Sequence, residues 1–157
     1  SLAILIGMAY LLIRRSADFR PILSAGLIFV ALSVVAGYIL HPNYVFEYVI
    51  YHLLSGGLLF GLAFMITDPA TSPITRPGRW IYGLIIGTLV FAIRIFGNLP
   101  EGVAFALLFA NLLVPIIDYP KWAINKYNKK FIIGFAISFI LIVGITGLIL
   151  GGFVIWN

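Results

Sequence analysis

The sequence contains no cysteine among its 157 residues. Disulfide bonds, cysteine-ligated zinc and cysteine-ligated iron–sulfur clusters are therefore excluded within this chain. Histidine is nearly as rare, with only His41 and His52, eleven positions apart. A haem held by two histidines needs both imidazoles facing each other at similar depth, and His41 lies in a polar turn. The sequence therefore predicts one turn residue and one packed helix residue.

Charged residues are also scarce, at 10% of the chain against about 25% in soluble domains. Hydrophobic residues make up 62%, and the mean hydropathy is +1.14. A chain this apolar cannot cover its own surface with polar groups in water, so we expect a lipid bilayer around it. The net charge of +5 comes from basic residues in short clusters between apolar runs, and we expect no nucleic-acid partner.

Six apolar runs divide the chain and predict an all-α integral membrane protein with about six transmembrane helices. A span needs about 20 apolar residues, and the first run is shorter, so we interpret it as the tail of a span. Since Ser1 lies beside that run, we expect the chain to be an internal piece of a longer polypeptide. The runs extend over residues 2–13, 21–40, 44–66, 80–96, 101–117 and 131–156.

The loops between these runs alternate in charge. Loops 14–20, 67–79 and 118–130 carry lysine or arginine, whereas 41–43 and 97–100 carry neither. The positive-inside rule places the three basic loops in the cytoplasm and both chain ends outside.

Glycine occurs in pairs at a spacing that lets two membrane helices approach closely. The ordinary glycine frequency of membrane helices is the alternative explanation. The doubled glycine at positions 56 and 57 lies inside the third run, and it predicts a break of the kind that lines cavities in transporters. The pairs are Gly57 with Gly61, Gly83 with Gly87, and Gly147 with Gly151.

Loop 67–79 combines Asp68 with three prolines and four hydroxyl residues. Asp68 precedes Pro69, and this pair is expected to end the third helix. A rigid cytoplasmic loop that holds Asp68 at the membrane edge would bind a cation or dock a partner. A well-capped connector without such a role is the alternative.

Further polar residues lie in or beside the apolar runs. Arg94 lies near the outer interface, where a long side chain can reach the headgroups. Glu101 starts the fifth run, where a carboxylate complements the helix dipole, and the turn before it allows an ion pair with Arg94. A structural pair and a role near an ion path are equally supported. Asn111 lies in mid-span and needs a hydrogen-bonding partner, and Asp118 is expected at the cytoplasmic end of its helix.

The sequence contains no Ser/His/Asp constellation, phosphate-binding glycine loop or metal-ligand cluster. We therefore expect no catalytic residue and no metal site in this chain. The residues expected on an ion path or in structural polar contacts are Asp68, Arg94, Glu101 and Asn111.

A series of motifs between residues 55 and 119 resembles the D subunit of the Rnf electron-transport complex and its homologue, the B subunit of sodium-pumping NADH:quinone oxidoreductase. Residues 1–54 resemble these proteins only in general character. The motifs are Phe64–Arg79, Trp80–Gly83, Arg94–Gly97, Pro100–Val103, Phe109–Leu112 and Ile117–Tyr119.

The resemblance implies a membrane protein of ten helices in two five-helix inverted repeats, similar to urea transporters. Residues 1–119 would form the carboxyl-terminal repeat, and 120–157 a basic loop with an additional transmembrane helix. That helix is either a plain extra span or the anchor of a fused extracytoplasmic flavin domain.

The resemblance also implies FMN or riboflavin in the parent complex. Family members carry FMN on the threonine of a Ser-Gly-Ala-Thr type motif, which is absent here. The segment Asp68-Pro-Ala-Thr71 lacks the lead-in and lies on the cytoplasmic side of the expected topology, so we assign no flavin to Thr71. No cofactor-binding residue is assigned within this chain.

The expected function is that of a membrane subunit in a redox-driven complex, which passes electrons between flavins while Na⁺ or H⁺ crosses a bacterial or archaeal plasma membrane. Its expected partners are the bilayer and the other membrane subunits, and it would not be catalytic alone. Two alternatives remain open: a urea-transporter-like channel or vitamin transporter without electron transfer, and a structural membrane anchor.

Overall fold

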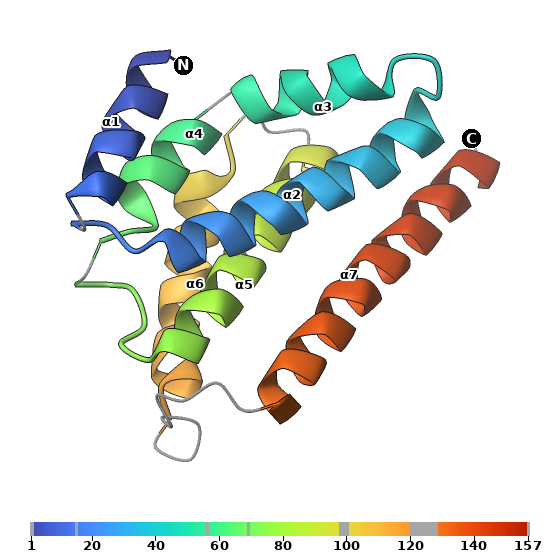
Figure 1. Cartoon of the computed structure of the whole chain (residues 1–157). Helices are drawn as coiled ribbons and strands as arrows, with labels where there is room; N and C mark the ends of the chain where they lie inside the picture. The colour runs from blue at the N-terminus through green and yellow to red at the C-terminus, as the bar shows by residue number, and fades with distance from the viewer. Residues whose placement is uncertain are drawn as a thin grey trace.

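The computed structural model describes residues 2–14, 16–55, 57–68, 70–97, 101–119 and 129–156. Within these ranges every regular element is a helix (Figure 1), as the sequence predicts. The elements in chain order are α1 (Leu2–Ile13), α2 (Phe19–Leu40), α3 (Val45–Leu54), α4 (Leu58–Phe60), the π-helix η1 (Gly61–Met65), α5 (Arg76–Phe96), α6 (Val103–Ile117) and α7 (Lys129–Trp156).

The helices follow the order of the six apolar runs, but not all of them are long enough to cross a bilayer. The helices α2, α5 and α7 have the length and apolar character to do so. A fourth candidate is α3 together with α4–η1, bent by 59° at the break between them. With 12 and 15 residues, α1 and α6 span about 18 and 22 Å, less than the roughly 30 Å hydrocarbon core. By length and composition the described chain thus offers three or four crossings.

The break in the third run lies where the doubled glycine predicts it. Ser55 ends α3 with an extended backbone, and Gly57 caps the start of α4. Gly56 itself lies outside the described residues. After a single turn the helix widens into η1, where the Ile66 N–H donates to the carbonyl of Gly61 at 2.9 Å. Short π-helical segments often occur at functional sites, and no sequence signal predicts this one.

The helices α2 and α5 lie side by side at the centre of the bundle and run in parallel. Gly83 faces Pro21, and Gly87, one turn later, faces Ala25. A Cβ atom on Gly83 would lie 2.9 Å from Pro21 Cα, and one on Gly87 would lie 2.5 Å from the Ala25 carbonyl oxygen. Because only glycine permits this approach, the predicted packing role of this pair is confirmed.

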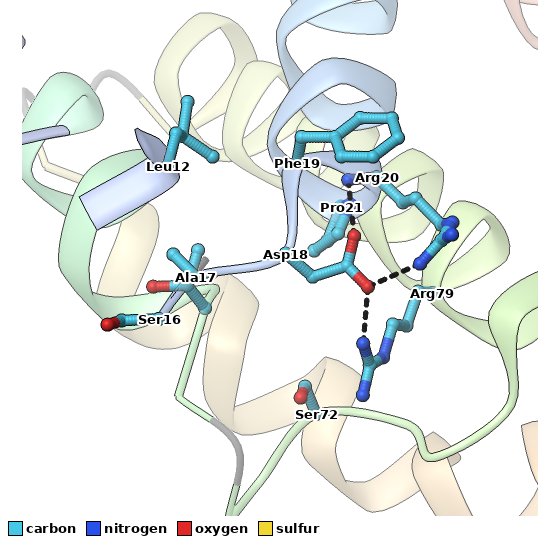
Figure 2. Close-up of a pocket in the computed structure, with 10 residues that line it drawn as sticks. Leu12, Ser16, Ala17, Asp18, Phe19, Arg20, Pro21, Ser72 and Arg79 are labelled. Atoms are coloured by element: carbon cyan, nitrogen blue, oxygen red, sulfur yellow. Dashed lines mark hydrogen bonds and ion pairs between the residues drawn. The ribbon is translucent and has the colours of Figure 1, made fainter. Parts of the chain in front are cut away.

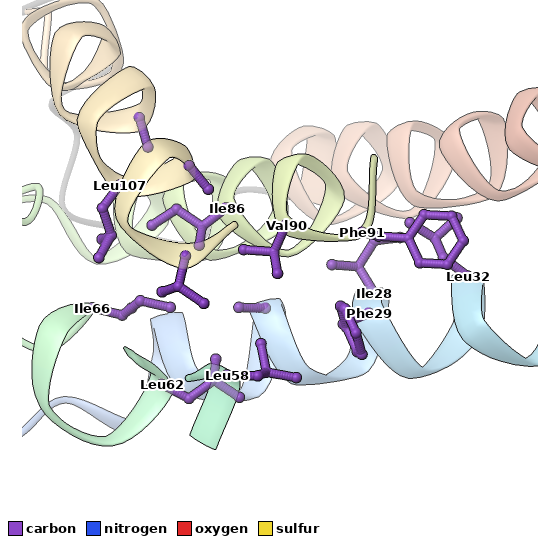
Figure 3. Close-up of a cluster of buried hydrophobic side chains, with 14 of the residues drawn as sticks. Ile28, Phe29, Leu32, Leu58, Leu62, Ile66, Ile86, Val90, Phe91 and Leu107 are labelled. Carbon is purple, nitrogen blue, oxygen red and sulfur yellow. The ribbon is translucent and has the colours of Figure 1, made fainter. Parts of the chain in front are cut away.

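An apolar core fills the space that α2 and α5 share with α4, η1 and α6 (Figure 3). Close packing of such side chains stabilises helix association in lipid, where the hydrophobic effect contributes little. The central members are Ile28, Phe29, Leu32, Leu58, Leu62, Ile66, Ile86, Val90, Phe91 and Leu107.

In each of the other two glycine pairs, one glycine permits a close contact between helices. Gly61 packs against α6, because a Cβ atom there would lie 3.2 Å from Val103 Cβ. Gly147 approaches Val35 of α2, whereas a Cβ atom on Gly151 would meet nothing within 4 Å. The helix α7 therefore lies at the edge of the bundle beside α2 (Figure 1), and among its described side chains only Leu150 is buried.

Candidate functional site

A cavity of about 440 Å³ lies between η1, loop 67–79 and α6, and polar side chains of the loop and of α6 line part of it. Asp68 and Thr71 line it from the loop, and Asn111 lines it from α6. The buried hydroxyl of Tyr82, from α5, donates to Asn111 Oδ1 at 2.6 Å. The hydrogen-bonding partner that Asn111 requires is therefore Tyr82, and the structure brings two predicted site residues, Asp68 and Asn111, to one cavity. Its other lining residues are Phe64, Met65, Ala104, Leu107 and Leu108.

Asp68 also shapes the loop in which it lies. Its carboxylate accepts hydrogen bonds from the Ala70 N–H at 3.2 Å and from the Thr71 hydroxyl at 3.3 Å, as in an Asx turn. The preceding helix ends at Met65, one residue before the end of the predicted run, and the chain turns there because the Asp68 N–H reaches back to the Met65 carbonyl. Pro69 lies outside the described residues.

Asp118 fastens the same loop to the end of α6. Its carboxylate accepts from the Ile74 N–H at 2.7 Å, and from the Thr75 N–H at 3.3 Å and the Thr75 hydroxyl at 2.7 Å. Thr75 in turn caps α5, since its Oγ1 accepts from the Gly78 N–H at 3.2 Å. Asp118 is the C-cap of α6, as predicted, and it also joins α6 to loop 67–79 through Ile74 and Thr75.

Arg94 forms a second polar site near the opposite end of α5. Its side chain is only 6% exposed and packs within the bundle, so it does not extend outward as the sequence predicts. Instead, Nη1 donates to the His52 carbonyl at 2.6 Å and Nη2 to the Ser55 carbonyl at 3.1 Å. These carbonyls belong to the last turn of α3, where four carbonyls lack helical partners. Its guanidinium also lies 5.5 Å from the centre of the Phe29 ring. Arg94 therefore caps the broken helix from a neighbouring element.

Glu101 lies at the same break but does not pair with Arg94. No ion pair joins the two among the residues that the structure describes, and Arg94 Nε is buried without a hydrogen-bonding partner there. The Glu101 side chain is exposed and approaches Gly57, on which a Cβ atom would lie 3.9 Å from Glu101 Oε1. The predicted pair is thus not formed, because the guanidinium is already used by the α3 carbonyls. The turn at 98–100, across which the pair is predicted, lies outside the described residues.

Loops 14–20 and 67–79 meet at a third polar cluster, which Figure 2 shows. Asp18 caps α2 by accepting from the Arg20 N–H at 3.0 Å, and it forms ion pairs with the Arg20 and Arg79 guanidinium groups. Arg79 Nε also donates to the Pro73 carbonyl at 2.9 Å. Burial raises the pKa of Asp18, but these hydrogen bonds and positive charges outweigh it, so the pKa lies below its usual 3.8. Two of the three basic loops therefore lie together, as the predicted topology requires. Arg15 and residues 120–128 of the third loop lie outside the described residues.

Three residues without a predicted site role hold these sites together: Tyr82, Asp118 and Asp18. Of the three, only Asp118 is predicted to have a structural role, at the end of a helix. Tyr82 carries a phenol into an apolar helix, where a buried hydroxyl needs a partner. Asp118 places a negative charge at a helix C-terminus, which the helix dipole disfavours, so other donors are needed. Asp18 stands directly before an apolar run, at an N-cap position. Each of these three patterns can be recognised in the sequence, but none of them identifies the residue that the side chain contacts.

Comparison with known proteins matches the chain to one family. A sequence model described as the NQR2, RnfD, RnfE family matches residues 1–125, which include α1 to α6 and exclude α7. The D subunit of the ion-translocating oxidoreductase complex of Stutzerimonas stutzeri is 59% identical over 69 residues, covering 44% of this chain and 20% of the relative. The protein of the same name from Cronobacter sakazakii is 41% identical over 119 residues, covering 76% and 33%.

A second group of relatives carries a different name. The B subunit of the Na⁺-translocating NADH-quinone reductase of Pseudomonas aeruginosa is 40% identical over 123 residues, covering 76% of this chain and 30% of the relative. The chain thus spans between a fifth and a third of the length of these three relatives.

Proposed function

The chain belongs to the NQR2, RnfD, RnfE family, and on this premise we propose that it forms the carboxyl-terminal membrane part of a subunit in a redox-driven ion-translocating complex. Relatives of both names are described as ion-translocating, which supports this class of activity. Within that complex, residues 1–119 correspond to one urea-transporter-like repeat and 120–157 to an additional helix. The other membrane subunits are its partners, and each of the six apolar segments crosses or enters the membrane. The basic loops face the cytoplasm of a bacterial or archaeal cell.

The observation that carries the proposed ion route is a cavity at the surface of the bundle in which three polar side chains lie among apolar ones. Asp68 supplies a carboxylate, Thr71 a hydroxyl and Asn111 an amide oxygen to the same space. Oxygen ligands of this kind suit hard cations such as Na⁺, as they suit protons.

The broken span supports the same proposal from the other end of α5. Transporters commonly use interrupted helices whose free carbonyls and dipoles face the transported ion. The likeness to transporters lies in the break alone. Here Arg94 occupies the carbonyls of His52 and Ser55, so a positive charge lies where transporters offer free carbonyls. Tyr82 and Arg94 lie about 18 Å apart along α5, a separation that supports two polar sites toward opposite faces of the bilayer.

Flavins carry the electrons in the proposed complex, as FMN or riboflavin. No flavin is assigned to a residue of this chain, because the flavin-bearing threonine motif is absent from its sequence and Thr71 donates its hydroxyl to Asp68. This chain therefore contributes ion passage and scaffold, while flavin chemistry occurs in other parts of the complex.

The proposal is tested in proteoliposomes that contain the whole complex. Electron transfer and ion uptake are measured together for the Asp68→Asn and Tyr82→Phe variants. We expect ion uptake per electron to fall several-fold, because one change removes a carboxylate and the other leaves Asn111 without its donor. Ser138→Ala is the matched control, since that hydroxyl bonds only within its own exposed helix.

Unchanged ion uptake and electron transfer in both variants would count against an ion route through this cavity. Solute or flavin uptake without any electron donor would instead support a transporter, and full activity with all polar residues replaced would support a structural anchor.

A further inference from the structure

A second cavity, of about 550 Å³, lies where the end of α1, the start of α2 and loop 67–79 meet the start of α5. Figure 2 shows its lining: the Arg20 and Arg79 guanidinium groups meet the Asp18 carboxylate on one side, and Leu12, Ser16 and Ala17 lie on the other. Nothing in the proposed ion route uses it. Its lining residues are Leu12, Ser16, Ala17, Asp18, Phe19, Arg20, Pro21, Thr67, Ser72 and Arg79.

The charges in this cavity sum to a single positive charge. Two arginines and one aspartate line the cavity, so their formal charges give a net charge of +1, and both arginines form ion pairs with Asp18. The hydroxyl of Ser72 lies beside Arg79, and the hydroxyl of Ser16 lines the other side of the cavity (Figure 2), so both add hydrogen-bond donors. A planar guanidinium binds phosphate oxygens in a bidentate manner, and serine hydroxyls complete the set of donors such a group accepts.

The opposite wall of the cavity is suited to lipid. Leu12 at the end of α1 lines it, whereas Phe19 at the start of α2 lies beside Arg20, whose guanidinium is 5.2 Å from the centre of the Phe19 ring; Phe19 is 48% exposed. Both belong to apolar helices that lead into the hydrocarbon region. The cavity therefore lies at the membrane edge, beside the two basic loops expected in the cytoplasm, where basic pockets between helices bind anionic headgroups.

We propose that this cavity binds the phosphodiester headgroup of an anionic phospholipid. The net positive charge of the lining residues matches the single negative charge of a phosphodiester. Free phosphate at neutral pH carries a larger negative charge, which the Asp18 carboxylate repels, and it has no acyl chain to contact Leu12 and Phe19. The bound lipid would join α1, α2 and α5 at their cytoplasmic ends.

The test follows the thermal unfolding of the full-length protein, purified in detergent and depleted of lipid. Dioleoylphosphatidylglycerol, dioleoylphosphatidylcholine and inorganic phosphate are added separately. We expect saturable stabilisation by phosphatidylglycerol alone, because its net charge is negative and its acyl chains match those of the neutral lipid. Equal stabilisation by both lipids would overturn the proposal, and stabilisation by inorganic phosphate alone would assign the cavity to free phosphate.

Variants locate the effect in this cavity. Arg79→Gln removes a charge-assisted contact, and we expect its apparent affinity for phosphatidylglycerol to fall about tenfold. Arg76→Gln is the matched control, since Arg76 starts the same helix, is exposed and does not line the cavity. Asp18→Asn keeps an N-capping side chain but removes the negative charge, so binding should tighten.

Arg79 also stabilises loop 67–79, so weaker binding in Arg79→Gln has two explanations. A second type of variant distinguishes between them. Ala17→Phe fills the cavity while both arginines remain, and it should abolish the specific stabilisation. Wild-type affinity for phosphatidylglycerol in both Arg79→Gln and Ala17→Phe would overturn the proposal.

Discussion

Replacing Arg94 should selectively loosen the broken helix. The guanidinium makes two hydrogen bonds, to the His52 and Ser55 carbonyls, at 2.6 and 3.1 Å. A hydrogen bond from a charged donor contributes about 1.5–3 kcal/mol, so the two together contribute about 3–6 kcal/mol. Part of this loss is offset, because replacing the arginine also removes the cost of burying its charge. We therefore expect Arg94→Met to lower the free energy of unfolding by about 2–4 kcal/mol, and Arg94→Lys by about half as much, since a single ammonium replaces a two-pronged donor.

Two measurements together test this reasoning. Reversible unfolding in bicelles gives the global loss, and amide hydrogen exchange shows where the structure opens. We expect faster exchange in the last turn of α3 and in α4, and unchanged exchange in α7. Arg76→Gln provides the control, because it removes an exposed arginine from the same helix. If Arg94→Met unfolds like the wild type and the α3–α4 segment keeps its protection, the capping role of Arg94 is refuted.

Three further outcomes follow from the packing and the ion pairs. Gly87→Ala should destabilise the protein by about 1–3 kcal/mol, because its Cβ would overpack α2, whereas Gly134→Ala, with open space around it, should not; denaturant titration compares them. Asp118→Asn should speed proteolysis within loop 67–79, because that carboxylate accepts three hydrogen bonds from the loop, and an unchanged cleavage rate would contradict this. The stabilisation by Asp18, whose pKa lies below 3.8, should be complete at neutral pH and disappear as the pH falls through that lowered value, so the stability difference from Asp18→Asn should shrink only in acid.

The positions of the helices were largely predictable because length and hydropathy determine them. The runs at 21–40 and 80–96 lie within α2 and α5, and the doubled glycine marks the break before α4. The number of crossings was not predictable in the same way. A run of apolar residues does not reveal that a helix bends by 59°, or that α6 begins only at Val103.

The sequence shows which buried polar side chains need hydrogen-bonding partners, but it does not show which residues those partners are. A buried amide at Asn111 had to be satisfied, yet Tyr82 lies 29 positions away and only the packing of α5 on α6 joins them. For Arg94, proximity in sequence favoured Glu101, whereas the fold offers carbonyls 39 and 42 positions away. Long-range geometry of this kind depends on how whole helices pack, which local patterns do not encode. The family resemblance, in contrast, rested on ordered motifs, and the match over residues 1–125 confirms it.

The most direct test of the proposed ion route is the number of ions moved per electron by the whole complex carrying Asn111→Leu. Leucine keeps the size of the side chain but removes the amide oxygen from the cavity and leaves the Tyr82 hydroxyl unpaired. The complex is reconstituted beside the Ser138→Ala control, and Na⁺ and H⁺ uptake are both recorded during electron transfer. The account predicts continued electron transfer with a several-fold lower ion yield in Asn111→Leu alone. An ion yield equal to that of the control, for both ions, would contradict it.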